Sequence, residues 1–237
     1  MASVGLAPVF ALQGRYVRRV TPRLPEPPGP RTGVRGDGPA LRLLIVGDSA
    51  AAGVGAASQD EALSGRLVDE LAPTFRVSWM VVARTGATTG GTARYLARRP
   101  ADECDAFDVA VLSLGGNDVM GRRPLRRWLE DMGDVTAFLR ERFAVRHILI
   151  SGLPPIHAFT ALPQPLRWYL GARARRFDRA LAAWARSQSD CEHLPLELTN
   201  GAGLLATDGL HPGPRLYERW STELARRVRA CWTSIQP

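Results

Sequence analysis

One short apolar run that ends in a polar turn constrains the fold more than any other feature of the chain. Five of the six residues from Leu41 to Val46 are aliphatic, which is typical of a strand buried on both faces of a parallel sheet. The run stops at Gly47-Asp48-Ser49. Because ligands of open α/β sheets bind beyond the carboxyl ends of the strands, Ser49 stands where a nucleophile would be useful.

The rest of the chain repeats this alternation of apolar runs and helical patterns. Further strands are predicted at 75–82, 107–114, 147–150 and 194–198, and helices at 61–71, 124–139, 167–187 and 214–232. Pro195 cannot donate to a strand ladder, so the last strand is expected at an edge. Alternating β and α units predict an α/β fold with a parallel sheet, right-handed crossovers and helices on both faces.

A serine hydroxyl is inert unless a base takes its proton, and the sequence holds a candidate pair for that role. Asp208 precedes His211 by three residues, so the carboxylate can accept from one imidazole nitrogen while the other nitrogen faces Ser49. Between them, an apolar run leads into Gly115-Gly116-Asn117-Asp118. Plainer interpretations exist for Ser49 as a helix cap, Asn117 as a loop stabiliser and His211 as a helix-entry residue.

Together these residues resemble the SGNH hydrolases, also called GDSL-type esterases and lipases, a family marked by blocks that carry Ser, Gly, Asn and His. Three blocks match at Gly47-Asp48-Ser49, Gly115-Gly116-Asn117-Asp118 and 208–212. In the second block Gly86 follows Ala83-Arg84-Thr85, where the family often has Asn, and Ala50 replaces the Leu of the family name. The resemblance covers residues 41–237, and the joint occurrence of the blocks is more specific than any one of them.

The resemblance implies a three-layer, flavodoxin-like α/β/α fold with a five-stranded parallel sheet of order 2-1-3-4-5. It also implies a serine esterase that works through an acyl-enzyme, with Ser49 as nucleophile, His211 as base and Asp208 as the residue that orients the imidazole. The backbone N–H groups of Ser49 and Gly86 and the side-chain amide of Asn117 are expected to hold the oxyanion.

Small or lipid-like acyl esters are the expected substrates, in the manner of a lysophospholipase or thioesterase. The family also permits deacetylation of a carbohydrate or acyl transfer to an acceptor other than water. A catalytically silent binding domain on the same fold is the alternative outside enzymes. Asp48, which can accept from backbone donors in the turn, is assigned a supporting role.

Composition and charge limit the partners that we expect. The formal net charge is +8, and all 31 basic residues are Arg. Because the arginines are scattered over several segments, we interpret this bias as codon usage. We therefore expect a small-molecule substrate and no nucleic acid. The positive charge favours anionic membrane surfaces only weakly.

Three cysteines without CxxC spacing indicate neither a disulfide framework nor a zinc site. The implied mechanism needs no metal and no cofactor, and the sequence leaves the oligomeric state open.

Residues 1–40 are predicted to form an N-terminal arm and a connector outside the esterase domain at 41–237. The arm is apolar from Ala2 to Leu12 but too short to span a membrane, and it lacks the basic start of a secretory signal, so we expect a cytoplasmic location. Packing on the domain or disorder is the favoured interpretation, and weak contact with a membrane surface is the alternative. From Thr21 to Pro39, six prolines and four glycines indicate an extended connector.

The segment 153–166 follows the fourth predicted strand and therefore emerges at the same sheet edge as Ser49. Its apolar side chains include Leu153, Ile156 and Phe159. They either form a wall of the acyl pocket or pack under the loop, and the sequence leaves both interpretations open.

Overall fold

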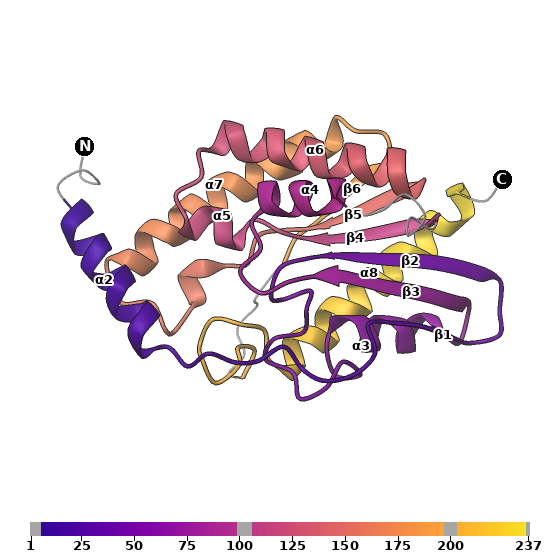
Figure 1. Cartoon of the computed structure of the whole chain (residues 1–237), viewed down its shortest axis with the longest axis horizontal. Coiled ribbons are helices and arrows are strands. Elements are labelled where there is room, and N and C mark those ends of the chain that lie inside the picture. Colours follow the sequence, from indigo (N-terminus) through magenta and orange to yellow (C-terminus); the bar gives the residue numbers. More distant parts are fainter. Residues whose placement is uncertain (1–5, 99–105, 197–202, 236–237) are drawn as a thin grey trace.

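Six strands form one sheet in the computed structural model, which describes residues 6–98, 106–196 and 203–235 (Figure 1). The strands are β1 (Thr32–Arg35), β2 (Ala40–Gly47), β3 (Arg76–Ala83), β4 (Val109–Ser113), β5 (His147–Ser151) and β6 (Cys191–Leu194). Their order is β1-β3-β2-β4-β5-β6, and every pair is parallel except β1 with β3. The order 2-1-3-4-5 expected for five strands is therefore confirmed for β2 to β6.

The sixth strand is the difference from the sequence expectation. β1 lies within the Pro/Gly-rich connector and adds an antiparallel edge beside β3. It is only four residues long, and three of its four residues are exposed, so it carries no alternating apolar signal. Gly33 is required there, because a Cβ would lie 2.4 Å from the ring of Trp79.

The last strand differs from its prediction in position. β6 spans Cys191–Leu194, three residues earlier than expected, and residues 197–198 of the predicted strand lie outside the described part of the chain. Pro195 has no N–H to donate, which explains why the ladder ends before it. The expected edge position is confirmed by the strand order.

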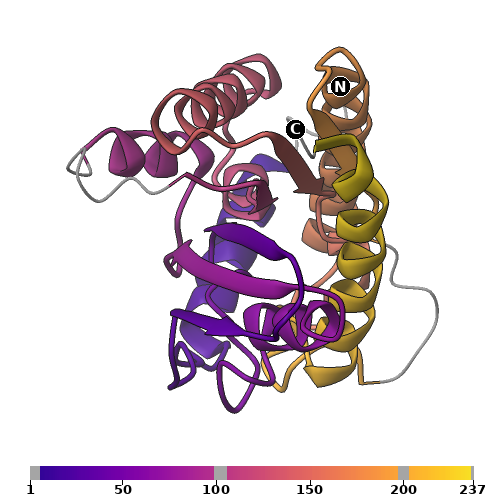
Figure 2. The same cartoon turned by 90° about the vertical axis from the view of Figure 1, so that its right-hand side faces the viewer.

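Helices cover both faces of the sheet (Figure 2). One face packs against α3 (Leu63–Leu71) and α8 (Pro214–Ile235), and the other against α4 (Thr89–Ala97), α6 (Leu125–Phe143) and α7 (Leu166–Arg186). Successive side chains of a strand point to opposite faces. Accordingly, Leu43 and Ile45 of β2 join the α3–α8 core, whereas Leu44 and Val46 join the core on the other face.

The N-terminal helix α2 (Ala7–Val20) packs on the domain. Its buried residues are Phe10 and Val17, and the ring of Phe10 stacks on that of Tyr169 in α7 with centroids 4.6 Å apart. Residues 2–5 of the predicted apolar arm lie outside the described part. Among the described helices, none is long and apolar enough to cross a bilayer.

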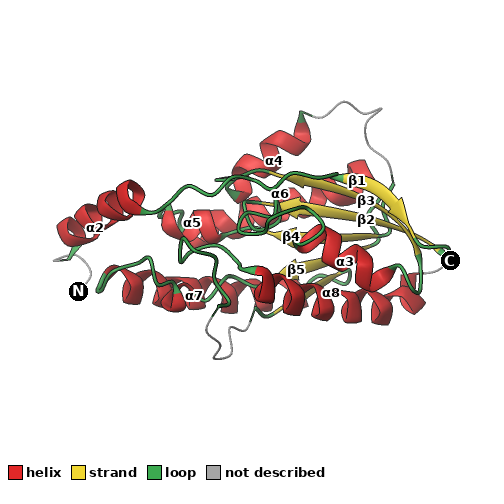
Figure 3. Cartoon of the chain, turned by 90° about the horizontal axis from the view of Figure 1, so that it is seen from below, coloured by secondary structure: helices red, strands yellow, loops and turns green. Residues whose placement is uncertain are grey.

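The carboxyl ends of the parallel strands meet at one end of the molecule (Figures 1 and 3). The short helices α5 (Gly116–Met120) and η2 (Ile156–Ala158) follow β4 and β5 at this end, and α2 lies beside them. The loops that follow β2, β3, β4 and β5 therefore converge at this edge.

Candidate active site

Ser49 lies in a tight turn directly after β2. A Cβ at Gly47 would lie 2.5 Å from both the Ala51 Cβ and the Ser113 carbonyl oxygen, so only glycine fits where the strand enters the turn. The backbone N–H of Asp48 donates to the Ser113 oxygen at 3.0 Å. This bond fastens the turn to β4, and Ser49 remains 9% exposed.

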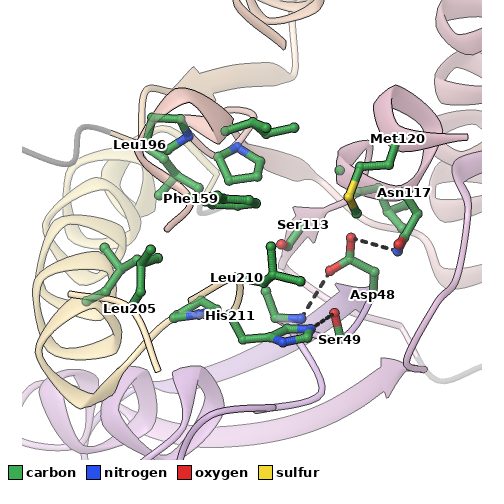
Figure 4. A pocket seen from close by; sticks show the side chains of 18 of the residues that line it. Asp48, Ser49, Ser113, Asn117, Met120, Phe159, Leu196, Leu205, Leu210 and His211 are labelled. Atoms are coloured by element: carbon green, nitrogen blue, oxygen red, sulfur yellow. Dashed lines mark hydrogen bonds between the residues drawn. The ribbon is translucent and has the colours of Figure 1, made fainter. Parts of the chain in front are cut away.

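His211 connects Ser49 with Asp208. Its Nε2 lies 2.9 Å from the Ser49 Oγ (Figure 4), and its Nδ1 lies 2.5 Å from the Asp208 Oδ2. The other oxygen of Asp208 accepts from the backbone N–H groups of Leu210 and His211, each at 3.0 Å. The three side chains that the sequence placed in one mechanism thus form one continuous hydrogen-bonded chain.

The electrostatics keep Asp208 ionised. Its side chain is 1% exposed. Burial alone would raise the pKa of Asp208, but the hydrogen bonds from His211 and Leu210 outweigh it and hold the pKa below its usual value. A buried carboxylate with this many donors can orient the imidazole and support a positive charge on it.

The loop that carries His211 is tied to the loop that carries Ser49. Gly55 has φ +101°, and a Cβ there would lie 2.2 Å from the Pro212 carbonyl oxygen. The Tyr217 hydroxyl of α8 lies 3.0 Å from the Ala50 oxygen and 2.8 Å from the Val54 oxygen. The close approach at Gly55 thus joins the two loops, and Tyr217 fastens the segment that carries Ser49 to α8.

Gly86 and Asn117 line the same cavity as Ser49. Gly86 adopts φ +77° with nothing within 4 Å of an added Cβ, so the space over its backbone is open to a ligand. The Asn117 Nδ2 donates to the Ala87 oxygen at 2.9 Å and lies 3.4 Å from the Asp48 Oδ2. The amide is therefore held between the turn after β2 and the loop after β3.

Asp48 is a buried carboxylate beside the nucleophile position. Burial raises its pKa to about 6, although the Ala50 N–H and the charge of His211 act in the opposite direction. The Ala50 N–H donates to its Oδ1 at 3.1 Å. The supporting role expected for Asp48 in the turn agrees with this bond.

A second buried carboxylate joins the loops after β3 and β4. Asp118 accepts from the Thr89 N–H at 2.9 Å and from its hydroxyl at 2.8 Å. The Trp128 Nε1 of α6 donates to the same hydroxyl at 3.0 Å. This network holds the start of α5, which carries Asn117, against the start of α4.

Glu26 is a residue of the site region that sequence reasoning did not find. Its Oε1 accepts from the Thr85 N–H and hydroxyl, both at 2.7 Å, while Arg31 pairs with its other oxygen. Arg31 also donates to the Ala83 oxygen at 2.9 Å. Because Thr85 lines the cavity, the connector is fastened to the loop that carries Gly86. No local sequence pattern signals this contact, since its partners are 59 residues apart.

The cavity over Ser49 has a volume of about 240 Å³ and mostly apolar walls (Figure 4). Ile156 and Phe159 of the segment 153–166 line it, as the wall interpretation requires. Leu153 does not line the cavity; it packs in the core, where its Cδ2 lies close to Gly115. Apolar lining residues that the sequence did not single out are Met120, Leu196, Leu205, Leu210, Leu216 and Trp220.

Another histidine pairs with a carboxylate at the neighbouring strand end. The His193 Nε2 lies 2.9 Å from the Asp178 Oδ1 of α7, and the same oxygen accepts from the Leu153 N–H at 2.9 Å. This pair holds the start of the segment 153–166. Within the described residues, no three His, Cys, Asp or Glu side chains are grouped as metal ligands.

Comparison with known proteins identifies a family model and a relative that match this chain. The model of the GDSL-like Lipase/Acylhydrolase family matches residues 45–219. A GDSL-like esterase of Mycobacterium tuberculosis is 29% identical over an alignment of 203 residues, which covers 77% of this chain and 62% of that protein. The chain thus spans less than two thirds of the length of this relative.

Solved structures of esterases share the fold. The psychrotrophic esterase EstA of Pseudoalteromonas sp. superimposes with a TM-score of 0.61 at 17% identity, over 81% of this chain and 98% of that chain. The carbohydrate acetylesterase Est24 of Sinorhizobium meliloti gives 0.62 at 17% identity, over 80% and 99%. At such identities the likeness establishes the three-layer fold and nothing finer.

Proposed function

The chain belongs to the GDSL-like lipase/acylhydrolase family of ester hydrolases, and from this premise we propose that it hydrolyses carboxylic esters through an acyl-enzyme on Ser49. The hydrogen-bonded chain from Ser49 through His211 to Asp208, at an apolar cavity, carries the proposal. This arrangement of nucleophile, base and orienting carboxylate activates serine on several unrelated folds.

In the first step the Ser49 Oγ attacks the ester carbonyl carbon while the His211 Nε2 takes the hydroxyl proton. The tetrahedral oxyanion is held by the backbone N–H groups of Ser49 and Gly86 and by the Asn117 amide. His211 then passes its proton to the leaving alkoxide, and the ester C–O bond breaks. Asp208 stays ionised throughout and stabilises the imidazolium.

Deacylation repeats these steps with water as the nucleophile. His211 takes a proton from the water, whose oxygen attacks the acyl carbon, and returns the proton to the Ser49 oxygen as the acid leaves. The bond from Oγ to the acyl carbon breaks, and the free enzyme is restored.

Loss of the nucleophile is the direct test. Ser49→Ala and His211→Ala should each abolish turnover of p-nitrophenyl esters, and the double variant should lose little more, because groups that act as a unit are not additive. A fluorophosphonate probe should label the wild type but not Ser49→Ala. Ser113 also lines the cavity, so Ser113→Ala removes a neighbouring hydroxyl and should keep the label. Wild-type turnover by folded Ser49→Ala would refute the mechanism.

We also propose that the acyl group lies against Ile156 and Phe159, and that small or lipid-like acyl esters are the substrates. Each methylene accommodated there adds up to about 0.8 kcal/mol of binding. Phe159→Ala should shift the optimal chain length upward while acetyl-ester turnover stays within a few-fold. Leu153→Ala is the matched control, because Leu153 belongs to the same segment but is not among the residues that line the cavity, and its chain-length profile should match the wild type.

Carbohydrate deacetylation and acyl transfer are the alternatives to test in the same assays. A related fold is named as a carbohydrate acetylesterase, so acetylated sugars belong in the panel beside lysophospholipid and acyl-CoA. Product analysis in the presence of an alcohol acceptor separates transfer from hydrolysis. A panel in which only acetylated sugars turn over would replace the acyl-chain proposal.

A further inference from the structure

Helix α2 has a buried face and an unusual exposed face. Phe10 and Val17 are each 7% exposed and join the core cluster, and the ring of Phe10 stacks on Tyr169 of α7. In contrast, Leu12 is 64% exposed and Tyr16 is 60% exposed. The exposed apolar side chains of α2 are Val9, Leu12, Tyr16 and Val20, and their spacing of three and four residues places them on one stripe.

This stripe concentrates the exposed apolar surface of the molecule. Four of the seven large hydrophobic side chains exposed in the described residues belong to it. A fifth is Trp168, which is 56% exposed at the start of α7, next to Tyr169, on which Phe10 stacks. Below, the α2 surface means Val9, Leu12, Tyr16 and Val20.

Positive charge surrounds the α2 surface. Residues 6–25 contain Arg15, Arg18, Arg19 and Arg23 and no acidic residue. All four arginines are exposed, and none forms an ion pair with another described residue. Their guanidinium groups suit phosphate, which they can bind in a bidentate manner.

Helix α2 lies at the end of the molecule where the parallel strands have their carboxyl ends (Figure 3), and the cavity is lined by residues that follow those strands. Gln13 of α2 donates to the Gln164 oxygen at 2.6 Å, and its own oxygen accepts from the Leu166 N–H at 3.1 Å. These partners end the segment 153–166, which supplies Ile156 and Phe159 to the cavity wall.

We propose that the α2 surface binds the face of an anionic lipid bilayer. Apolar and aromatic side chains enter the boundary between headgroups and acyl chains, while the arginines contact lipid phosphates, as in other helices that lie in the plane of a membrane. A second copy of this chain fits less well, because a two-fold contact through α2 would bring the same arginines face to face. Binding at this end would bring the cavity close to lipid esters. That use of the contact rests on the proposed function, whereas membrane binding itself is independent of it.

Sedimentation of the full chain with vesicles tests the proposal. Vesicles of phosphatidylcholine with an equal amount of phosphatidylglycerol should bind the protein, and vesicles of phosphatidylcholine alone should bind it at least roughly tenfold more weakly, because each arginine gains roughly fivefold in affinity at an anionic surface. Binding should also weaken as salt shortens the Debye length from about 30 Å at 0.01 M to about 8 Å at 0.15 M.

Two sets of variants separate the apolar and the electrostatic contributions. Leu12→Ser with Tyr16→Ser should lower the affinity at least roughly tenfold, given about 0.8 kcal/mol for each buried methylene. Val34→Ser removes another exposed apolar side chain, 53% exposed on β1, and should leave binding unchanged.

The variants that remove positive charge from α2 are compared with a control that removes the same number of charges elsewhere. Arg15→Gln, Arg18→Gln and Arg19→Gln together should lower the affinity on the order of a hundredfold. The control triple variant, Arg175→Gln with Arg179→Gln and Arg186→Gln, also removes three positive charges from exposed side chains, here on α7. Its loss of affinity should be less than a tenth of the loss in the α2 triple variant. Circular dichroism checks that α2 and the fold persist in each variant.

Three results would overturn the proposal. One is absence of wild-type binding to the anionic vesicles at low salt. Another is equal loss of binding in the two arginine triples, which would mean that net charge alone attracts the protein. The third is a dimer in sedimentation velocity that the Leu12 and Tyr16 changes dissolve. Hydrolysis of a soluble short-chain ester by the same variants should stay at the wild-type level, so a failure of esterase activity remains distinguishable.

Discussion

At the scale of single residues, the Asn117 amide contacts its neighbours in the fold and also faces the position proposed for the oxyanion. It donates to the Ala87 oxygen at 2.9 Å and lies 3.4 Å from the Asp48 carboxylate, yet it also borders the cavity over Ser49. The longer of these two contacts leaves an amide hydrogen that an oxyanion can attract, because a charge-assisted hydrogen bond of ordinary length is stronger than a contact at 3.4 Å.

The oxyanion role of Asn117 predicts a particular split of kinetic constants. Asn117→Ala should lower kcat on the order of a hundred- to a thousand-fold, about 3–4 kcal/mol, and change KM only slightly, because the bond forms with the transition state. Steady-state kinetics with a p-nitrophenyl ester measures both constants. An effect on KM alone would assign Asn117 to loop stabilisation or substrate binding.

Asp48 makes the stability of the fold depend on pH. Its pKa rises from 3.8 to about 6 through burial, so the folded state binds this proton more tightly than the unfolded state. The fold therefore loses stability as pH rises from about 4 to about 6, by an amount of about 3 kcal/mol for two pKa units.

Asp48→Asn should remove that pH dependence, because an amide does not ionise and its oxygen can still accept from the Ala50 N–H. Urea unfolding of both proteins at several pH values tests this. The variant should gain stability relative to the wild type between pH 4 and 6. Parallel stability curves over this window would show that Asp48 is not the titrating group.

At the scale of elements, the connector controls the loop after β3. Burial would raise the pKa of Glu26, but the bonds from Thr85 and Arg31 hold it below its usual value, so the carboxylate is charged at neutral pH. Through Thr85 it holds the backbone next to Gly86, whose N–H is proposed to meet the oxyanion.

Glu26→Gln should lower kcat roughly tenfold with KM within a few-fold, because charge-assisted hydrogen bonds to the Gly86 loop are exchanged for weaker neutral ones. Glu130→Gln is the control: Glu130 also pairs with arginines, on α6, and its change should leave both constants alone. A wild-type kcat for Glu26→Gln would limit the connector to a structural role.

The elements that the sequence predicted well are those with strong periodic patterns. β2 to β5 and the helices α3, α6, α7 and α8 follow apolar runs whose period decides between strand and helix. α4 was missed because Gly90 and Gly91 interrupt its pattern, and glycine weakens a helix. The reason for Gly90 is tertiary, since a Cβ there would lie 2.8 Å from the Asp131 carboxylate.

The residues of the candidate site also divide into those that the sequence predicts and those that only tertiary packing brings to the cavity. Ser49 and Asn117 closely follow apolar strands, and Asp208 is only three residues from His211, so the sequence suffices to predict that these residues come together. Glu26 was not predictable, because its contact joins a connector to a loop 59 residues later. Leu153 and Phe159 also look alike in sequence, and only packing decides that Phe159 lines the cavity while Leu153 does not.

At the scale of the whole molecule, the first forty residues combine two separable contributions. α2 buries Phe10 and Val17 against the domain, whereas the connector contacts the loops around the cavity. Gln59 strengthens the contact of the connector with these loops. Its side-chain amide donates to the oxygen of Pro27 in the connector at 3.2 Å and to the oxygen of Ala52, which follows Ser49, at 2.9 Å.

Two truncated chains should separate these contributions. A chain that starts at Thr21 should lose about 1.5–3 kcal/mol of stability for each of the two buried side chains but keep kcat within a few-fold. A chain that starts at Thr32 also lacks Glu26 and should lose roughly tenfold more turnover, as one charge-assisted bond predicts. Thermal unfolding and steady-state kinetics provide the measurements. Equal loss of kcat in both chains, each folded, would show that α2 itself supports the site.

The connector and α2 have a consequence for synthesis on the ribosome. The contacts that fasten them to the rest of the fold are made with later parts of the chain: β1 pairs with β3, Glu26 binds Thr85, and Phe10 stacks on Tyr169. Translation proceeds at about 5–20 residues per second, so roughly 7 to 30 seconds pass between the synthesis of α2 and that of α7. Helix α2 can therefore pack on the domain only after α7 has been made, although it precedes every other described element of the chain.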